Sequence, residues 1–470
     1  MVYSRSFQLD QFTPVALYHK LRTEFSNDDT FLFESADGCG EGNYSFIVLG
    51  AHERILHRDG KTIYQNEHGD RDVVDYNPLD FLKNYYAQID FNAYREKSRE
   101  LGIGFVDGFI GYIGYDSVKL FEPVLRKSMD ALKDELKIAD INLIRPKISL
   151  IYSHRTHKIT LITPFEEKIE ELEKIEELIK MPYEYLPLVS TKDAQEGEFA
   201  ISKEKFFDMV DRSKEMIKSG DVFQILMSNR YTQRAKVDPL SFYRILRTKN
   251  PSPYMFLLDF DSFSIAGSSP EVMVRLNDGD MLLRPIAGTR KRGNTIERDD
   301  ELEEEMLNDP KERAEHLMLV DLGRNDIGRV AKTGTVKVHD MMHVEKYSHV
   351  MHMVSDVVAK IDEKYDMFDL FAATFTAGTM TGAPKIRAME LIAEFEGLKR
   401  NFYSGAIGYF GFDGNMDSAI TIRTSLITDE KIILQAGAGV VADSQNELEY
   451  LEVKNKLGAL MSTLEDLNQP

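Results

Sequence analysis

Cysteine, tryptophan and long apolar runs are scarce or missing in this sequence. Only one of the 470 residues is a cysteine, Cys39, which excludes a disulfide within the chain and favours a reducing cytoplasm. No apolar run is long enough to span a membrane, and the N-terminal segment lacks the apolar core of a signal peptide. Tryptophan is absent, which by itself decides nothing.

Positive charge is also in deficit. The chain has 58 Lys and Arg against 78 Asp and Glu, a formal net charge of −20, which argues against nucleic acid and anionic membranes as partners. An acidic protein that binds an anionic substrate needs local compensation, from clustered cations or a bound metal ion. The length exceeds what one compact core usually spans, so two domains or one large intertwined domain is expected.

Composition divides the chain into three regions. Residues 1–165 read as short strands and turns broken by helices. Residues 166–199 read as a charged surface helix followed by a linker, and residues 200–466 carry the sharpest signals. In this last region Ser202 is predicted to cap a helix that runs to about Lys218.

The segment Pro285–Gly293, PIAGTRKRG, has anion-binding character. It reads as a strand that runs into a turn, whose backbone amides and three cations could face an anion. Ala287, in the middle of the segment, offers no chemical group for such a role.

Two acidic helices are predicted far apart in the sequence. In the first, Asn308 or Asp309 precedes Pro310, a pattern typical of a capped helix start. Helical spacing places Glu312 and Glu315 on the inward side of this helix.

The second acidic helix begins near Ser444, which forms a capping-box pattern with Glu447. Its predicted apolar stripe consists of Val453, Leu457, Leu460 and Leu464, and the stripe is bordered by Glu449, Glu452 and Lys456. Buried carboxylates without partners are unfavourable, and a divalent cation is one solution. Oxygen-only ligands favour Mg²⁺ or Ca²⁺ over Zn²⁺. Pairing with surface lysines is the alternative, and spacing alone leaves both open.

Six ordered motifs closely resemble those of the chorismate-utilising enzymes, above all the members that form anthranilate. They are PIAGTRKRG, ERAEHLMLVDLGRNDIGR, KYSHVMHMVS, AGTMTGAPKIRAME, SGAIGYFGFDGNMDSAITIRTS and AGAGVVADSQNELEYLEVKNK. The resemblance is dense over residues 200–465 and looser before them. It implies an α/β (α+β) fold, the chorismate-utilising enzyme fold, with two packed, mainly antiparallel sheets and outer helices.

The resemblance also implies an activity, the Mg²⁺-dependent conversion of chorismate and ammonia to anthranilate and pyruvate. It places Mg²⁺ and the ring carboxylate of chorismate among Glu312, Glu315, Glu449 and Glu452, with Glu315 and Glu452 touching the metal. Its catalytic matches are the general acid Glu271, His352 for pyruvate elimination, and Thr379. Its substrate-binding matches are Gln224, Ala287, Gly288, Thr289, Tyr403, Arg423, Gly437, Ala438, Gly439 and Lys456. Without the resemblance, Arg423 would read as a salt bridge and residues 437–439 as a tight turn.

Two positions discriminate among the family's reactions. Members that form aminodeoxychorismate typically carry a lysine nucleophile at the position of Ala287, and a methyl group cannot attack C2. Members that add water carry a lysine base at the position of Gln224, and an amide cannot deprotonate water. Both residues favour direct attack by ammonia.

A tryptophan site away from the catalytic pocket is the further implication of the resemblance, with L-tryptophan as an inhibitor. Its matches are Glu34, Ser35, Pro253, Tyr254, Met255, Ile407, Tyr409 and Asp417. An indole favours an apolar slot, and Glu34 can meet the amino group. A proline turn before a strand is the alternative for residues 250–256. Phe33 replaces the usual leucine, and Asn43 or Tyr44 stands where relatives often have a basic residue.

The chain contains no plausible glutaminase, because Cys39 lacks the sequence context of an amidotransferase nucleophile. A separate glutamine amidotransferase subunit is therefore expected to supply the ammonia. Two alternatives stay open: an aminodeoxychorismate synthase subunit, and a non-catalytic sensor of tryptophan or chorismate.

Overall fold

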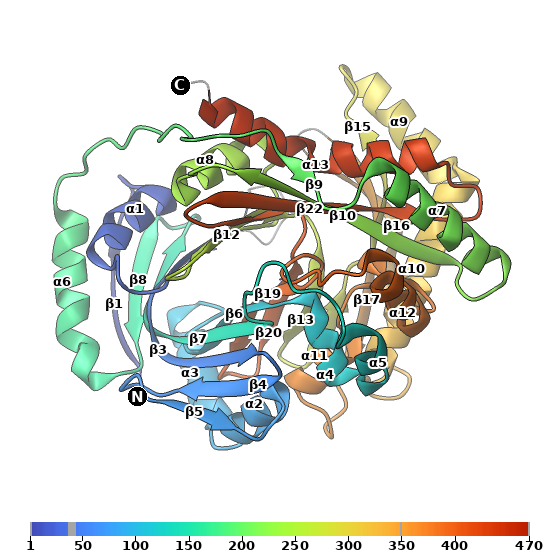
Figure 1. Ribbon diagram of the computed structural model, residues 1–470. Coiled ribbons are helices and arrows are strands. Elements are labelled where there is room, and N and C mark those ends of the chain that lie inside the picture. Colours follow the sequence, from blue (N-terminus) through green and yellow to red (C-terminus); the bar gives the residue numbers. More distant parts are fainter. Residues whose placement is uncertain (1, 36–43, 348–349, 469–470) are drawn as a thin grey trace.

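The computed structural model describes residues 2–35, 44–347 and 350–468, so Cys39 and Asn43 lie outside the described residues (Figure 1). The strands of its two sheets are β1 (Tyr3–Gln8), β2 (Thr30–Glu34), β3 (Tyr44–Arg58), β4 (Lys61–Gln65), β5 (Arg71–Val74), β6 (Gly108–Ile113), β7 (Ile141–Ser153), β8 (Lys158–Thr163), β9 (Glu198–Phe199), β10 (Gln224–Arg234), β11 (Tyr254–Asp259), β12 (Ser264–Ser269), β13 (Val272–Asn277), β14 (Asp280–Leu283), β15 (Ile286–Lys291), β16 (Lys337–Lys346), β17 (Val350–Lys360), β18 (Gly382–Ala383), β19 (Ala406–Gly411), β20 (Met416–Ile420), β21 (Thr424–Ile427) and β22 (Lys431–Val440).

The helices are α1 (Pro14–Glu24), α2 (Pro78–Tyr86), α3 (Phe91–Leu101), α4 (Val118–Phe121), α5 (Arg126–Met129), α6 (Ile169–Lys180), α7 (Lys203–Lys218), α8 (Pro239–Lys249), α9 (Ile296–Asn308), α10 (Pro310–Gly328), α11 (Met367–Thr374), α12 (Lys385–Glu396) and α13 (Asn446–Asn468). A short 3₁₀ turn, η4 (Gly378–Met380), precedes α12. Within the described residues, no helix is long and apolar enough to cross a membrane.

Two long strands, β3 and β7, pair with each other and join two antiparallel sheets. From β3 the first sheet continues through β2, β11, β12, β21, β22 and β10. From β7 the second sheet continues through β6, β19, β20, β13, β14 and β17, and β15 and β16 also pair with β17. The expected arrangement of two mainly antiparallel sheets is therefore confirmed.

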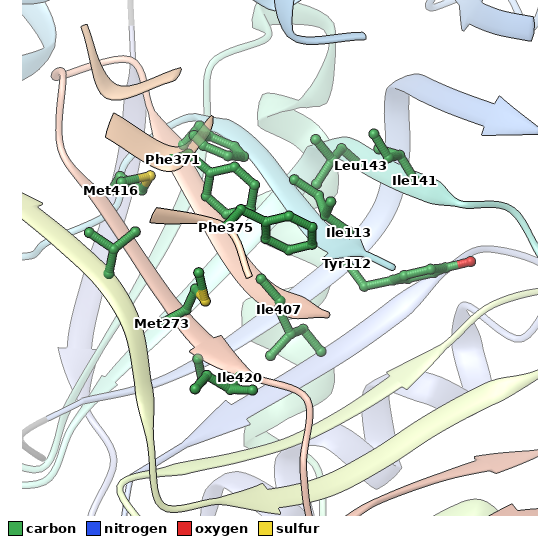
Figure 2. Close-up of a cluster of buried hydrophobic side chains, with 14 of the residues drawn as sticks. Tyr112, Ile113, Ile141, Leu143, Met273, Phe371, Phe375, Ile407, Met416 and Ile420 are labelled. Atoms are coloured by element: carbon green, nitrogen blue, oxygen red, sulfur yellow. The ribbon is translucent and has the colours of Figure 1, made fainter. Parts of the chain in front are cut away.

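The largest apolar core lies between the two sheets. It combines side chains of β6, β7, β13, β19 and β20 with helix α11 and with one face of β11, β12 and β21 (Figure 2). Met273, Ile407 and Ile420 approach Phe371 and Phe375 of the α11 segment in this core. A second core covers the other face of the first sheet, where α1, α6, α7, α8 and α13 pack (Figure 1).

The first and third of the regions predicted from the sequence, residues 1–165 and 200–466, contribute strands to the same two sheets. Strand β2 pairs with β11, and β6 pairs with β19, so residues 1–165 and 200–466 meet along two strand edges. The segment between them forms α6 and an extended stretch that ends in β9. The linker therefore connects parts of one intertwined body.

Local predictions in the third region agree closely with the structure. Ser202 accepts a hydrogen bond from the Lys205 amide at the start of α7, and Asp309 caps α10 ahead of Pro310. The capping box at Ser444 is wrong, because the Ser444 hydroxyl accepts from the Val441 amide and also bonds the Glu449 carboxylate.

Candidate active site

Helices α10 and α13 come from distant parts of the chain and bring four glutamates together. Glu312 and Glu315 are half-buried on α10, and Glu449 and Glu452 are half-buried on α13. An ion pair between Lys311 and Asp443 at 3.2 Å ties the start of α10 to the loop before α13. The predicted stripe of α13 is fully buried, and Glu452 at its border lies near enough to Glu315 of α10 for the two charges to interact.

Three of the four carboxylates of this cluster have a donor or a cation from the protein beside them, in addition to the bond of Glu449 with Ser444. Glu312 accepts from Arg290 at 2.8 Å and Glu315 from the Gln224 amide at 3.2 Å. Lys456, one turn further along α13, forms an ion pair with Glu452 at 2.7 Å.

Burial and mutual repulsion set the electrostatics of the cluster. The pKa of Glu315 is raised by burial, and the negative charges of Glu312 and Glu452 add to the increase. Burial likewise raises the pKa of Glu449, with a further contribution from Glu452. Four acids therefore share a site with too little positive charge to neutralise them.

This donor set fits a hard divalent cation in its chemistry. All four side chains offer carboxylate oxygens, and burial raises the pKa of two of them, Glu315 and Glu449, which a nearby cation would oppose. Among the described residues, however, no three His, Cys, Asp or Glu side chains form a ready-made metal site. Arg290 and Lys456 hold two of the carboxylates in the structure, so metal binding requires these side chains to exchange partners.

Glu271, a buried carboxyl group directly before β13, lies close to Lys456 of the glutamate cluster. Glu271 is 8% exposed, and its carboxylate accepts a 2.6 Å hydrogen bond from the Thr379 hydroxyl of η4. Burial raises the pKa of Glu271 to about 7, against the lowering effects of Thr379, Lys456 and Arg423. A carboxyl group with this pKa can donate a proton near neutral pH.

Arg423 supplies an uncompensated cation in the kink between β20 and β21. Its backbone adopts a left-handed conformation with φ of 51°, which turns the chain between the two sheets. Burial lowers the pKa of its guanidinium, while the nearby Tyr403 and Glu271 oppose the decrease. In the described part of the chain no carboxylate lies within ion-pairing distance of Arg423, so it is available for an anionic ligand.

The glycines at 437–439 belong to strand β22 and do not form a turn. They pair with β10, while β21 pairs with β22 only as far as Leu434. Lys456 donates to the Gly437 carbonyl at 3.0 Å, which shows that this peptide edge faces α13. Since the N–H and C=O of a strand residue point to the same side, the amides of Gly437 and Gly439 face the site as well.

A bulge in β15 contacts His352 of β17, the remaining predicted catalytic residue. Gly288 has φ of 61°, and the register against β17 shifts between Ala287 and Thr289. The Nδ1 atom of His352 lies 3.0 Å from the Gly288 carbonyl and 3.1 Å from the Thr289 hydroxyl. Because the carbonyl can only accept, Nδ1 carries the proton and Nε2 remains a free base. Burial lowers the pKa of His352, which keeps the ring neutral.

Two of the three basic residues of PIAGTRKRG pair with carboxylates and do not face an open anion site. Arg290 pairs with Glu312, and Arg292 pairs with Asp299 at the start of α9. Their role in the structure is to link β15 to α9 and α10.

A separate apolar cavity of about 400 Å³ lies between β2, β11, β13 and β19. All eight residues predicted for the second ligand site line it: Glu34, Ser35, Pro253, Tyr254, Met255, Ile407, Tyr409 and Asp417. Glu34 and Met255 are direct neighbours in the β2–β11 pairing. Two polar residues, Tyr254 and Asp417, lie in the wall of this apolar cavity. They satisfy each other there, because the Tyr254 hydroxyl donates to Asp417 at 2.8 Å.

Sequence reasoning missed several cations that organise these sites. Arg275 donates to the Tyr254 hydroxyl and pairs with Asp417, and Arg247 of α8 pairs with Glu34. A charged residue within the apolar run VMVRL was a usable signal for Arg275. Arg247 gave none, because it lies on an ordinary amphipathic helix.

Comparisons with known proteins agree with this geometry. A family model described as chorismate binding enzyme matches residues 28–462. Anthranilate synthase component 1 of Aquifex aeolicus is 44% identical over 97% of this chain and 93% of the relative. The protein of the same name from Acinetobacter calcoaceticus is 41% identical, over 97% of this chain and 93% of its own length.

Solved structures show the same architecture. Anthranilate synthase component I from Streptococcus pneumoniae superposes with a TM-score of 0.77 at 34% identity, covering 89% of this chain and 92% of that chain. The menaquinone-specific isochorismate synthase MenF from Escherichia coli reaches a TM-score of 0.75 at 19% identity, covering 99% and 94%. This second likeness shows the fold alone.

Proposed function

The chain belongs to the chorismate binding enzyme family, and on that premise we propose that it is the chorismate-converting subunit of an anthranilate synthase. It is a lyase that converts chorismate and ammonia to anthranilate, pyruvate and water, the first committed step of tryptophan biosynthesis. The observation that carries the proposal is the buried Glu271 beside the unpaired Arg423 and the four-glutamate cluster.

Substrate binding follows from the charges around the site. Chorismate carries two carboxylates, and Arg423 with the amides of Gly437 and Gly439 offers a cationic, donor-rich end for the pyruvyl carboxylate. The other end of the site is acidic, and Glu315 and Glu452 would hold Mg²⁺ there, with Glu312 and Glu449 beside them. When bound, the ion supplies the positive charge that the ring carboxylate needs.

The first chemical step requires a proton donor. Ammonia forms the new bond to C2, both double bonds of the ring shift towards C4, and the C4–oxygen bond breaks. Glu271 gives its proton to the departing hydroxide, which leaves as water, and the new amine returns a proton to the carboxylate. The Thr379 hydroxyl holds Glu271 in place at 2.6 Å.

The second step requires a base. The bare Nε2 of His352 takes the proton from C2, the bond from C3 to the enolpyruvyl oxygen breaks, and the ring becomes aromatic. The released enolpyruvate gains a proton at its methylene carbon and becomes pyruvate. The neutral state of His352 supports this role.

Ala287 and Gln224 favour this reaction over those of related enzymes. The methyl group of Ala287, next to the Gly288 bulge, leaves no nucleophile that could form a covalent intermediate. The Gln224 amide donates to Glu315 and has no basic nitrogen to activate water. An aminodeoxychorismate-forming enzyme would stop before pyruvate loss, and a sensor would bind chorismate without turnover.

A glutamine amidotransferase subunit is part of the proposal, because the relatives are named as one component of a synthase. The chain by itself then uses ammonium salts at raised pH, where free ammonia is available. A cytoplasmic location also belongs to the proposal, and the single cysteine supports it.

Product analysis tests the reaction. The purified chain receives chorismate, Mg²⁺ and ammonium, and anthranilate and pyruvate are measured together. Equal amounts of the two support the proposal. Aminodeoxychorismate without pyruvate, isochorismate, or binding without turnover each overturns it in favour of a named alternative.

L-Tryptophan as an inhibitor is the second part of the proposed function. The cavity of about 400 Å³ has apolar walls for an indole and a buried carboxylate, Glu34, for an ammonium group. Because the chain has no tryptophan, the fluorescence of an added L-tryptophan reports its own binding. Turnover and fluorescence measured over the same titration test the proposal; unchanged turnover at millimolar L-tryptophan contradicts it.

A further inference from the structure

Arg400 is the largest fully buried side chain in the described part of the chain, and the proposed reaction does not use it. It lies four residues after Glu396, the last residue of α12, and its exposed fraction is 1%. The two side chains form a bidentate ion pair at 2.9 and 2.6 Å. Two desolvated ions cost free energy that an apolar pair of similar volume would not cost, so stability alone does not account for them.

The contacts of Arg400 reach the segments that carry the site. Its guanidinium donates at 2.9 Å to the carbonyl of Met380, the residue after Thr379. It also donates at 2.9 Å to the carbonyl of Leu226, two residues after Gln224. The guanidinium carbon lies 5.8 Å from the ring centre of Tyr403. One side chain therefore contacts η4, β10 and the segment of Tyr403.

The contacts of Glu396 extend the network to the glycine strand. Its carboxylate accepts from the Ser228 amide at 2.8 Å and from the Ser228 hydroxyl at 2.9 Å. Gln435 of β22 in turn donates to that hydroxyl at 2.9 Å, two residues before Gly437. The network is continuous and entirely buried.

We propose that Arg400 and Glu396 are positioning residues, which fix the spacing between Thr379, Gln224, Tyr403 and the glycines of β22. None of the network's members needs to touch the substrate. The contacts at Met380, Leu226 and Gln435 end one or two residues from Thr379, Gln224 and Gly437. The proposed function, on which this inference rests, places these three residues at the site. Loss of the pair displaces η4, so that the Thr379 hydroxyl no longer holds the Glu271 carboxylate at 2.6 Å.

The deciding variant replaces both ions with apolar residues, Arg400→Met together with Glu396→Leu. It leaves no buried charge unpaired, but the Ser228 amide and the carbonyls of Met380 and Leu226 lose their partners. Its melting temperature is therefore expected to fall by less than that of Arg400→Met alone, which strands the Glu396 charge. Its kcat/KM for chorismate, measured at constant free ammonia, is expected to fall at least about tenfold. The alkaline limb of its pH profile is expected to move to higher pH, because Glu271 loses the hydrogen bond that favours its charged form.

Two comparisons keep the test decisive. Arg145→Lys alters a half-buried arginine outside the network, which pairs with Asp107, and is expected to lower the melting temperature without moving the pH limb. Arg400→Lys retains the positive charge but lacks the planar set of guanidinium N–H donors. It replaces the double variant in the same measurements if the double variant does not fold. A folded double or lysine variant with wild-type kcat/KM and an unmoved limb overturns the proposal.

A binding measurement separates this inference from the proposed function. Calorimetry with chorismate and Mg²⁺ needs no turnover, and at least about tenfold weaker binding by the double variant supports the positioning role. Equal affinity of the two proteins contradicts it. Failure of the wild type to form anthranilate would count against the proposed function and leave the calorimetric result standing.

Discussion

Two buried glutamates, Glu271 and Glu34, have the same side chain but different hydrogen-bond partners. Their exposed fractions are 8% and 5%, and both lie at strand ends where the sheets meet. Arg247 contacts both oxygens of Glu34, at 3.0 and 2.9 Å, and Tyr243 donates to it at 2.7 Å. Glu271 has one neutral donor, Thr379, and no ion pair among the described residues.

The difference gives each residue a distinct chemistry. The guanidinium of Arg247 holds both oxygens of Glu34 in a charge-assisted pair at the wall of the cavity, where the carboxylate can meet an ammonium group. A carboxyl group with a pKa raised to about 7 can give up a proton and recover it. The two sites are also neighbours, because Pro270 and Val272 on either side of Glu271 line the apolar cavity.

The largest expected effect is the loss of the proton donor. Glu271→Gln keeps the size of the side chain but cannot protonate the leaving hydroxide, so kcat for anthranilate should fall about 10²–10⁴-fold. Fluorescence-detected binding of L-tryptophan should stay within about twofold of the wild type, which shows that the fold is intact. A kcat within tenfold of the wild type would assign the proton to another group.

The reciprocal change addresses the other glutamate. Glu34→Gln removes the charge that meets the ligand's ammonium group, a hydrogen bond of about 1.5–3 kcal/mol, so inhibition by L-tryptophan should weaken about 10–100-fold. Arg247 can turn to solvent, since its side chain is 31% exposed, so the fold should tolerate the change. The inhibition constant and the uninhibited kcat are measured together; an unchanged inhibition constant would mean that the cavity binds something else.

Sequence reasoning reached the side chains of both sites but not the contacts that distinguish them. Spacing on α13 correctly placed Val453 and Leu457 inside, with Glu449 and Glu452 at the border, because an amphipathic helix repeats every 3.6 residues. It could not show that α10 and α13 meet, since this depends on how two distant segments pack. The resemblance supplied that expectation, and the structure brings the four glutamates together.

Partners contributed by long-range packing were beyond prediction. Arg247 reaches Glu34 across more than two hundred positions, and Arg290 occupies Glu312. Nothing in the order of residues distinguishes these arginines from others on exposed faces. The tight turn that residues 437–439 suggest without the family resemblance does not form, because pairing with β10 makes the glycine-rich segment a strand.

Binding of Mg²⁺ tests a third group of carboxylates, the four glutamates of α10 and α13, which outnumber the two cations that pair with them, Arg290 and Lys456. Burial and mutual repulsion raise the pKa values of Glu315 and Glu449, so without metal these groups reduce stability above their folded pKa values. That penalty is relieved as the pH falls through the folded values towards the unfolded value of 4.5. Mg²⁺ should therefore raise the melting temperature more at pH 8 than at pH 5.5. At a Mg²⁺ concentration of a hundred times the dissociation constant, the free energy of unfolding should rise by about 2.7 kcal/mol.

A matched variant identifies the source of that stabilisation. Glu315→Gln with Glu449→Gln should abolish the Mg²⁺-dependent shift and should melt higher than the metal-free wild type at pH 8. Differential scanning calorimetry at both pH values measures both effects. An undiminished shift in the double variant would place the metal elsewhere.

The smallest expected effect is a shift in the pKa of Glu271 when its hydrogen-bond donor, Thr379, is removed. The Thr379 hydroxyl donates to the Glu271 carboxylate, which favours the charged form and lowers the pKa. Thr379→Val keeps the shape but removes the donor, so the pKa of Glu271 should rise by about one unit, since about 1.4 kcal/mol corresponds to one unit. The kcat/KM profile of the free enzyme, near pH 7 on its alkaline side for the wild type, should move to higher pH by this amount. Thr379 donates to Glu271 and not to Glu34, so the L-tryptophan affinity of this variant should show no matching change with pH. A limb that stays in place would mean that Glu271 is not the group that titrates.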